Sequence, residues 1–504
     1  MGCIIAEILE ILNRIVWGVP ALVLFLSVGI YLSFCTGFVQ ITMFPKAIRV
    51  FCTKLLNRDT KGTGVSSYQA LCTALAATVG TGNLAGVAGA IAIGGPGSIF
   101  WMWVCGFLGM VTKFAEATLA VFFRVRNEKG ETVGGPMYII SRGMGAKWNW
   151  MAVLYCFFGV VAAFGVGNAV QINAVIDGIN STLMAYGGQE STMNNIAIGI
   201  ILAVLVTWML SGGATRIGSV TERLVPIAAV FYLLLCIGVL FLRFDQIPAA
   251  FSAIVTGAFS PQAVTGGVIG SAFTALRVGA ARGVFTNEAG MGTASIAHGS
   301  AEVQHPGEQG LMGIMEVFLD TIVICTMTAL VILCSGIQIP FGLDTGMTLT
   351  TEAFASVYGS WVCVPLCVAV CFFALATILG WGMYGARCAQ YLFGDSVWKS
   401  FVALQAVGVI FGAVINTGTV WLLSETVNGL MAIPNLIALI WHGPLLARVI
   451  KKYKNGSMTA NGGTYENLNQ CKPMRTFSHA EVPSLRSKSK EKWRKGLSSE
   501  YRSA

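Results

Sequence analysis

The chain has 504 residues, of which 55% are hydrophobic and only 11% are charged, and its mean hydropathy is +0.71. Because soluble globular proteins carry about a quarter charged residues, this composition excludes a soluble domain and indicates a polytopic membrane protein. The net charge of +9 lies from residue 445 onward, where 13 Lys and Arg face 4 Asp and Glu. Such a segment is typical of a cytoplasmic end near anionic lipid, rather than of a nucleic-acid-binding tail.

Eleven apolar runs are long enough to cross a bilayer, which takes about 20 residues. They cover residues 15–38, 68–94, 97–123, 150–176, 195–212, 219–242, 265–290, 309–336, 360–386, 398–416 and 419–441. Lys and Arg gather in the connections after the first, third and fifth runs and in the tail, whereas the connection 177–195 has neither. The positive-inside rule therefore predicts a multi-pass cell-membrane protein with its N-terminus outside and its C-terminus in the cytoplasm.

The order of the runs predicts an all-α polytopic membrane protein with about 11 transmembrane helices. We expect a five-plus-five inverted repeat with broken helices and one extra N-terminal helix, because five is an odd number of crossings. The expected segments are 1–66 (extra helix and basic cytoplasmic loop), 67–243 (first repeat), 244–444 (second repeat) and 445–504 (basic, disordered tail). The second and seventh runs are then counterparts, and both carry glycine-rich polar interruptions, which in the seventh run extend from Ser271 to Gly290. Matched interruptions in inverted halves indicate the binding site of a secondary transporter.

The second run is interrupted by "VGTGN". Gly80 and Gly82 each cost about 1 kcal/mol relative to alanine in a helix interior, and backbone groups freed in lipid are costly unless something binds them. Free carbonyls attract a cation and free amides at a helix start attract an anion, so a sodium ion and an amino acid carboxylate would satisfy both. Close helix packing through Gly82 and Gly86 is an alternative, but it leaves Thr81 and Asn83 unexplained.

Charged residues inside the runs are expected to face the protein interior and to pair. Arg282 and Glu288, in "RGVFTNEAG", are expected to form gating or structural ion pairs near the cytoplasmic mouth, with direct ligand contact as an alternative. Lys113 and Glu116 lie three residues apart, and we expect them to pair or the lysine to extend to the membrane surface.

Four stretches closely resemble the alanine or glycine:cation symporter family, the sodium:alanine symporters. They are "ATVGTGNLAGVAGAIAIGGPGSIFWMWVCGFLGMVTKFAEATLA", "GGPMYII", "RGVFTNEAGMGTASIAHGSA" and "ALATILGWGMYG", and the resemblance extends over about residues 15–445. That family has the fold of the amino acid–polyamine–organocation superfamily, with inverted five-helix repeats. The resemblance implies sodium-coupled symport of small neutral amino acids, alanine or glycine first, into the cell by alternating access.

The resemblance also assigns residues to the site. Thr81, Gly82 and Asn83 match the unwound segment that receives the carboxylate of the substrate. Gln171, in "GNAVQIN", matches a polar residue that faces the site, although a lone glutamine in a membrane helix could instead bond a neighbouring helix.

Thr377 and Trp381, in "ATILGW", match residues that close the pocket around a small side chain. They are four apart and share one helix face; without the resemblance, Trp381 reads as a packing aromatic. The interruption of the seventh run, near Thr274 to Gly279, is expected to supply the opposite wall.

For sodium, the resemblance implies the carbonyls of Ala76 and Val79 and the hydroxyl of Thr377, and these hard oxygen donors suit a weakly held monovalent ion. Family members often carry serine just before that threonine, where this chain has Ala376. This departure leaves proton coupling open as an alternative.

Other functions are disfavoured by the sequence. A proton relay through Glu316 and Asp320 and a preference for glutamine or serine remain alternatives. A channel needs a continuous polar lining, whereas the polarity here is concentrated in two interruptions. There is no nucleophile–histidine pair or metal motif for an enzyme, and no cofactor is expected. The expected partners are a small neutral amino acid, Na⁺ and membrane lipid, with no nucleic acid; the sequence does not define the oligomeric state.

Overall fold

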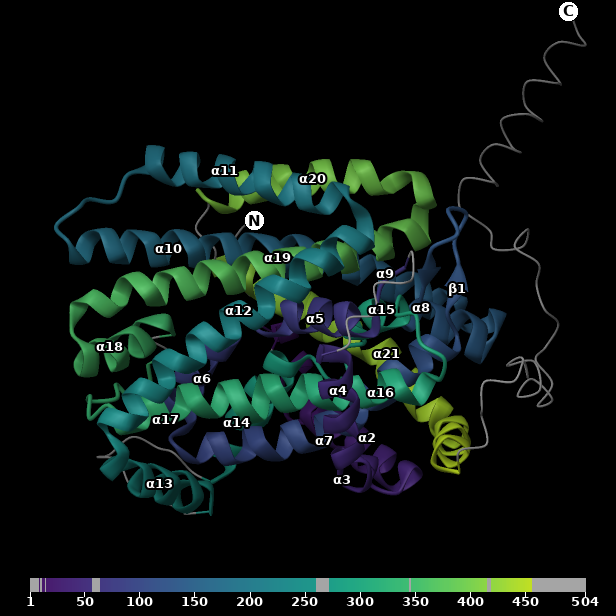
Figure 1. Ribbon diagram of the computed structural model, residues 1–504, viewed down its shortest axis with the longest axis horizontal. Helices are drawn as coiled ribbons and strands as arrows, with labels where there is room; N and C mark the ends of the chain where they lie inside the picture. Colours follow the sequence, from purple (N-terminus) through teal and green to yellow (C-terminus); the bar gives the residue numbers. More distant parts are fainter. Residues whose placement is uncertain are drawn as a thin grey trace, which may run out of the picture.

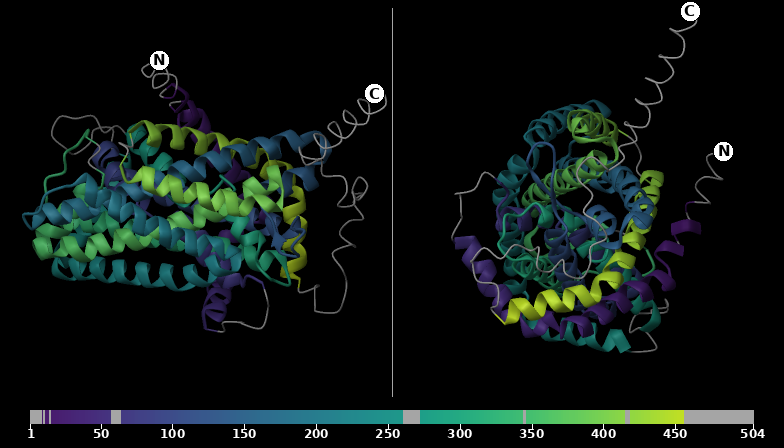
Figure 2. Two further views of the ribbon diagram at one scale, coloured as in Figure 1. Left: turned by 90° about the horizontal axis from the view of Figure 1, so that it is seen from above. Right: turned by 90° about the vertical axis from the view of Figure 1, so that its right-hand side faces the viewer.

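A computed structural model describes residues 9, 11–13, 15–56, 64–259, 272–343, 346–414 and 418–455. These residues are nearly all helical, apart from connections and a short antiparallel hairpin of β1 (Val125–Arg126) and β2 (Thr132–Val133). The longest helices lie along one direction of an elongated molecule (Figures 1 and 2).

The helices divide into a first and a second half of the chain. The first half contains α2 (Val19–Thr36), α3 (Val39–Thr42), α4 (Phe44–Leu56), α5 (Ser67–Thr78), the π-helical turn η1 (Gly82–Gly86), α6 (Val87–Gly94), α7 (Gly97–Phe122), α8 (Pro136–Tyr138), η2 (Ile139–Met144), η3 (Ala146–Trp148), α9 (Asn149–Phe164), η4 (Gly165–Ala169), α10 (Val170–Ala185), α11 (Thr192–Ser211) and α12 (Gly213–Leu242). The second half contains η5 (Phe244–Gln246), α13 (Ile247–Phe259), α14 (Ala272–Asn287), α15 (Thr293–Gly299), α16 (Pro306–Val317), η6 (Phe318–Cys325), α17 (Thr326–Cys334), α18 (Met347–Tyr358), η7 (Ser360–Val362), α19 (Cys363–Phe393), η8 (Asp395–Val397), α20 (Trp398–Gly412) and α21 (Gly418–Lys454).

The prediction of an all-α polytopic membrane protein is confirmed. Within the described residues, eight helices are long and apolar enough to cross a membrane, or nine if the bent pair of α5 with η1 and α6 counts as one span. The expected runs 265–290 and 398–416 correspond to α14 and α20, which have 16 and 15 described residues. Eleven crossings and the inverted repeat therefore stay predictions.

The helix break predicted at "VGTGN" is confirmed. α5 begins at a capping box, in which Ser66 accepts from the Gln69 amide and the Gln69 side chain accepts from the Ser66 amide. It ends at Thr78, and the chain turns by 53° before η1 and α6 continue. Two reciprocal cap bonds fix where the first half-helix starts, and the two glycines fix where it stops.

The second interruption lies at the end of the predicted stretch Ser271 to Gly290, and its expected position near Thr274 to Gly279 is wrong. Thr274 and Gly279 lie inside the continuous helix α14, which ends only at Asn287. A β-carbon at position 279 would lie 2.2 Å from the Ser98 carbonyl oxygen, so this glycine permits close packing on α7 rather than a break. The chain leaves the helix at Glu288, with φ 52°.

The last helix reaches further than predicted. α21 continues to Lys454, so the segment from 445 to 454 is helical and belongs to the body of the protein. Its last turns lie across the long direction (Figure 2), after Pro434 and Pro444 inside the helix. Lys46 of α4 sits 3.8 Å from the Tyr453 ring centroid, which fixes this end. The rest of the expected tail lies outside the described residues.

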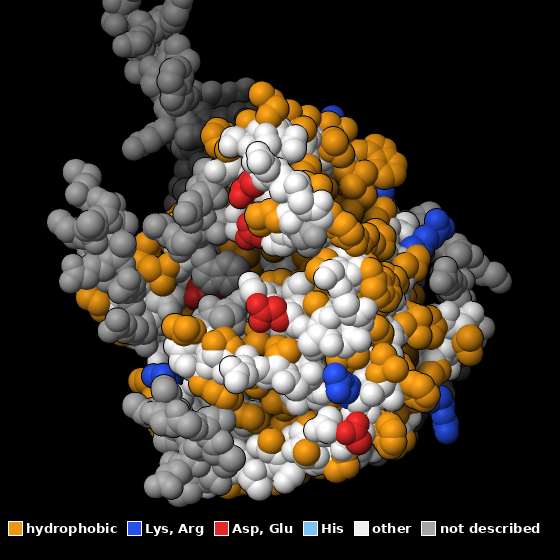
Figure 3. Space-filling view, turned by 90° about the vertical axis from the view of Figure 1, so that its left-hand side faces the viewer, with side chains coloured by type: hydrophobic (Ala, Val, Ile, Leu, Met, Phe, Trp, Pro, Cys, Tyr) orange, Lys and Arg blue, Asp and Glu red, His pale blue; other side chains and the backbone are white. Residues whose placement is uncertain are grey.

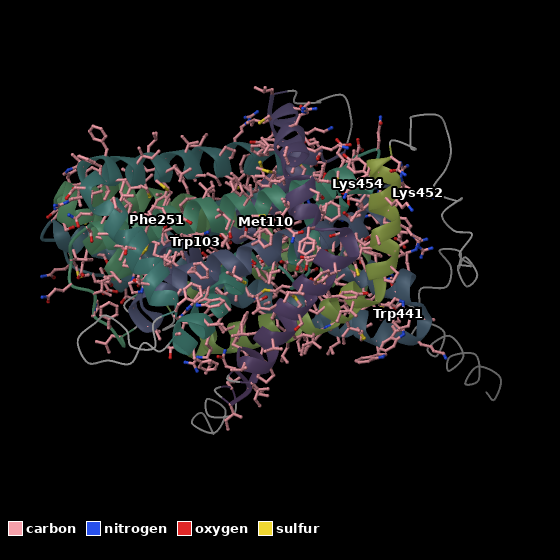
Figure 4. The ribbon with its side chains drawn as sticks, turned by 90° about the horizontal axis from the view of Figure 1, so that it is seen from below. Trp103, Met110, Phe251, Trp441, Lys452 and Lys454 are labelled. Carbon is pink, nitrogen blue, oxygen red and sulfur yellow. The ribbon has the colours of Figure 1, made fainter. Side chains whose placement is uncertain are left out.

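Basic side chains of the last helix lie at one end of the molecule. Lys452 and Lys454 gather with Trp441 at the end where α5 and α16 begin (Figure 4). The opposite end shows both acidic and basic side chains among apolar ones (Figure 3). The orientation of the protein in the membrane stays a prediction.

Candidate functional site

The break between α5 and η1 lies against α19. A β-carbon at position 80 would lie 2.7 Å from Thr377 Oγ1, so only glycine allows this approach of the backbone to the hydroxyl. Thr377 Oγ1 also donates to the Phe373 carbonyl at 3.0 Å, which holds it in place on its own helix. The predicted proximity of the first break to Thr377 is therefore present in the structure.

The break redirects two backbone amides. In a continuous helix the Gly80 amide would bond the Ala76 carbonyl, but it donates to Asn83 Oδ1 at 2.9 Å. The Asn83 amide, which would bond the Val79 carbonyl, donates to the Gly80 carbonyl at 3.2 Å. The carbonyls of Ala76 and Val79 thus lose their helical donors, which leaves their lone pairs available to a cation.

Gln171 of α10 contacts the first break from the other side. Thr81 Oγ1 donates to Gln171 Oε1 at 3.3 Å, and Gln171 Nε2 donates to the Val166 carbonyl at 3.1 Å. Both side chains are buried. Gln171 is therefore both a bond between helices and a part of the site, so the two interpretations of this residue are compatible.

The Asn83 side chain bonds both the break and the neighbouring turn η6. It is fully buried, and its Nδ2 donates to Asp320 Oδ1 at 2.7 Å, while its Oδ1 accepts the Gly80 amide. Asn83 therefore shapes the break and ties it to the π-helical turn η6. The predicted contact of Asn83 with a carboxylate stays a prediction.

The second break brings an acidic side chain to the same place. Glu288 follows α14 in a left-handed conformation, and Gly290 and Gly292 also have positive φ angles of 97° and 81°. Glu288 Oε1 accepts from Trp381 Nε1 at 3.1 Å, and its Oε2 accepts from Thr293 Oγ1 at 2.6 Å. These contacts place Glu288 at the site rather than at a mouth of the protein, and its pairing with Arg282 stays a prediction.

A pocket joins the two breaks. Its walls are Ala77, Thr78, Gly80, Thr81, Gly82, Val166, Val170, Gln171, Phe285, Thr286, Glu288, Thr377 and Glu425. Five predicted site residues line it, Thr81, Gly82, Gln171, Thr377 and Glu288. The other predicted residues are not among its walls: Ala76, Val79, Asn83, Thr274, Gly279, Arg282 and Trp381. Trp381 is fully buried behind Glu288 and packs on the backbone of Gly167.

Phe285, Thr286 and Glu425 line the pocket without having been predicted to. The last turn of α14 carries the first two, directly before the real break. The motif "NEAGMG" could have located the second break, because an acidic residue and two glycines interrupt the apolar run there.

A buried polar network supports both breaks from α7. Glu116 Oε1 accepts from the amides of Gly290 and Gly292 at 2.9 and 3.0 Å and from Asn435 Nδ2 at 2.7 Å. Lys113 does not pair with Glu116, which follows three residues later. Its Nζ lies 3.1 Å from Glu316 Oε1, and the side chains of Lys113 and Glu316 are both buried. The prediction that Lys113 extends to the membrane surface is therefore wrong.

The network continues to the start of the first broken helix. Glu316 Oε2 lies 2.9 Å from His298 Nε2, and His298 Nδ1 lies 2.7 Å from Gln309 Nε2. Gln309 Oε1 accepts from Ser67 Oγ at 2.6 Å. One chain of contacts therefore joins α7, α16, α15 and α5.

The donors at the first break suit a monovalent ion. The described residues contain no group of three or more His, Cys, Asp or Glu side chains that could hold a metal ion. What the break offers is backbone carbonyls and one hydroxyl, which are neutral hard donors.

Two broken helices that face each other around a buried polar pocket define a helical membrane transporter. A model of the sodium:alanine symporter family matches residues 2–466. The chain belongs to this family. The family is one of symporters rather than enzymes, and membership supports symport of an amino acid by a multi-pass membrane protein.

Individual relatives agree with this assignment. The chain is 41% identical over 438 residues to the sodium/alanine symporter AgcS of Methanococcus maripaludis, which covers 86% of this chain and 94% of the relative. It is 35% identical over 458 residues to the probable sodium/glutamine symporter GlnT of Bacillus subtilis, covering 90% and 91%. The crystal structure of MhsT in complex with L-phenylalanine shares the fold, with a TM-score of 0.52, 14% identity and coverage of 77% and 99%.

Proposed function

We propose that this protein is a sodium-coupled symporter of small neutral amino acids, with alanine or glycine as its first substrates. The observation that carries this proposal is the approach of Gly80 to Thr377 Oγ1 at a break whose two neighbouring carbonyls have lost their helical donors. A backbone in this state needs a ligand, because unsatisfied polar groups at membrane depth are costly.

In this proposal the sodium ion binds the carbonyls of Ala76 and Val79 and the Thr377 hydroxyl. All three residues are buried, so the ion replaces its water shell with protein oxygens. The alanine at position 376 removes one possible oxygen donor. A weakly held ion suits a carrier, because a coupling ion must also leave the site.

The substrate carboxylate is proposed to bind near Thr81 and Gly82, where the second half-helix begins and its amides and dipole favour a negative charge. Phe285 and Thr286 line the same pocket from the second break. Trp381 is fully buried and bonds Glu288, which lines the pocket, so its effect on the substrate side chain is proposed to act through Glu288.

Transport then follows from the two breaks. Sodium and substrate satisfy the loose ends of both helices at once, so the loaded state is stabilised relative to the half-loaded one. The protein exposes the pocket alternately to each side of the membrane. The basic end, with α21 and the start of α5, is proposed to face the cytoplasm of a cell-membrane protein, with the N-terminus outside.

The alternative is a proton-coupled symporter or one that prefers glutamine or serine. The relative named as a probable sodium/glutamine symporter favours a wider substrate range. Asp320, fully buried and bonded to Asn83, is a carboxyl group at the first break that could carry a proton.

Purified protein in liposomes separates these functions. We expect uptake of radiolabelled alanine driven by an inward sodium gradient, saturable and inhibited by glycine, with no uptake when choline replaces sodium. Uptake that follows a proton gradient without sodium would establish the alternative coupling, and stronger inhibition by glutamine than by glycine would establish the alternative substrate.

Thr377→Val removes the proposed sodium donor and keeps the shape of the side chain. We expect the sodium concentration for half-maximal uptake to rise about fivefold to tenfold, because one hydrogen-bonding or ligating group is worth about 1–1.5 kcal/mol. The matched control is Thr321→Val, since Thr321 Oγ1 bonds only the neighbouring Asp320 carboxylate in η6. An unchanged sodium dependence in Thr377→Val would remove this hydroxyl from the ion site.

Asn83→Ala removes the acceptor of the Gly80 amide and the donor to Asp320 Oδ1. We expect the initial rate of alanine uptake, normalised to protein in the membrane, to fall about tenfold or more, because a buried polar group that loses its partner costs about 1–3 kcal/mol. Asn180→Ala is the control, because Asn180 bonds Glu190 and Asn195 rather than the break. Equal rates in the two variants would contradict the role of Asn83.

A further inference from the structure

The pocket contains more negative than positive charge. Among its described walls, Glu288 and Glu425 are acidic and none is Lys or Arg. Glu288 is only 4% exposed, whereas Glu425 is partly exposed. A buried carboxylate is costly without a positive charge nearby. The charge of the buried Lys113 acts on Glu288 from outside the walls, so within the pocket a ligand with a cationic group is favoured.

Glu288 is held in a fixed orientation. Trp381 Nε1 donates to Oε1 and Thr293 Oγ1 donates to Oε2, one bond to each oxygen. An ionised carboxylate offers about four acceptor positions. The two bonds therefore orient the group and still leave acceptor positions for a ligand in the pocket.

The backbone at Glu288 has an unusual, positive φ angle. Its φ of 52° is one of two positive values among the described non-glycine residues, the other being Phe38. A side chain in this region costs about 1–3 kcal/mol. Glycine would remove that strain, as it does at Gly290 and Gly292, so the strained glutamate is a sign of a function for its side chain.

The first break lies across the same pocket, with Thr81 and Gly82 in its wall. Its amides favour a negative group, and Glu288 favours a positive one. A zwitterion placed between them satisfies both breaks in a single orientation.

We propose that Glu288 binds the ammonium group of the substrate and thereby selects α-amino acids against hydroxy acids and simple carboxylic acids. This inference rests on the proposed function, because it takes the pocket as the substrate site. Charge-assisted bonds to an ammonium group are stronger than bonds to a hydroxyl group. Loss of the charge at Glu288 therefore weakens alanine binding more than lactate binding.

The test compares L-alanine with L-lactate and propionate, which replace or lack the ammonium group. Binding is measured by the ligand-dependent rise of the unfolding temperature of the purified, sodium-loaded protein, and uptake is measured in liposomes. For Glu288→Gln we expect the affinity for alanine to fall about tenfold or more, while the response to lactate changes little. The ratio of alanine to lactate affinity therefore falls.

Thr293→Val is the matched control. It removes one bond to the carboxylate and keeps the charge, so it lowers stability and preserves the alanine-to-lactate ratio. If Glu288 only links α15 to α19, the ratio of alanine to lactate affinity is the same in Glu288→Gln, Thr293→Val and the unchanged protein. That result overturns the proposal.

Glu288→Asp provides a second variant in case Glu288→Gln does not fold. The shorter carboxylate is expected to weaken alanine binding while lactate stays excluded; alanine affinity equal to that of the unchanged protein contradicts the proposal. The unchanged protein separates this proposal from the proposed function: if it neither binds nor transports alanine or any other amino acid, the function itself is wrong.

Discussion

Lys113→Met is expected to destabilise the protein by about 3–5 kcal/mol, because removal of one partner leaves a buried charge without compensation. Lys113 Nζ and Glu316 Oε1 lie 3.1 Å apart with both side chains essentially inaccessible to solvent. The measurement is the unfolding temperature of the detergent-solubilised protein, together with the fraction that elutes as a single species.

The double variant Lys113→Met with Glu316→Gln is the control for this first prediction. It removes the carboxylate charge as well and keeps a hydrogen-bonding group beside His298. We expect it to be more stable than Lys113→Met alone, because replacement of both partners is often nearly neutral. A single variant as stable as the unchanged protein would mean that the pair carries no net charge interaction.

Gly80→Ala is expected to abolish sodium-dependent stabilisation and alanine uptake. The added β-carbon would lie 2.7 Å from Thr377 Oγ1, so the hydroxyl must move away from the break. Overpacking of this kind costs about 1–3 kcal/mol, and here it displaces a proposed ion ligand. The rise of the unfolding temperature with sodium concentration, without substrate, measures the effect directly.

Two further variants separate packing from ion binding. Gly82→Ala is the matched control, because no atom lies within 4 Å of a β-carbon at position 82 and sodium-dependent stabilisation should persist. Gly80→Ala combined with Thr377→Ala relieves the clash and should recover the unfolding temperature, but not its dependence on sodium. Recovery of that dependence would show that the Thr377 hydroxyl is dispensable for the ion.

The first break could be predicted because it breaks a local rule. Gly80 and Gly82 are poor helix formers in an apolar run, and nothing but a break explains two polar residues beside them. The shared face of Thr377 and Trp381 also followed from their spacing of four. Thr377 contacts the break as predicted, whereas Trp381 does not line the pocket.

The second break was misplaced because glycine has two uses in a membrane helix. Gly279 serves close packing on α7, whereas Gly290 and Gly292 serve positive φ angles. The sequence alone does not distinguish these uses. Likewise Lys113 was expected to pair with its neighbour Glu116, but its partner Glu316 lies 203 positions away, and sequence spacing cannot tell which helices face each other.

The contacts from Lys113 through Glu316, His298 and Gln309 to Ser67 also indicate which helices can move relative to one another. These contacts hold α5, α15, α16 and α7 together as one group, because each contact is buried and costly to break. Between this group and the α10–α19 pair, the described polar links at the pocket are fewer, Thr81 to Gln171 and Glu288 to Trp381. In the proposed transport cycle, the boundary between the two moving groups of helices therefore passes through the pocket, and a ligand bound there would hold the two groups together.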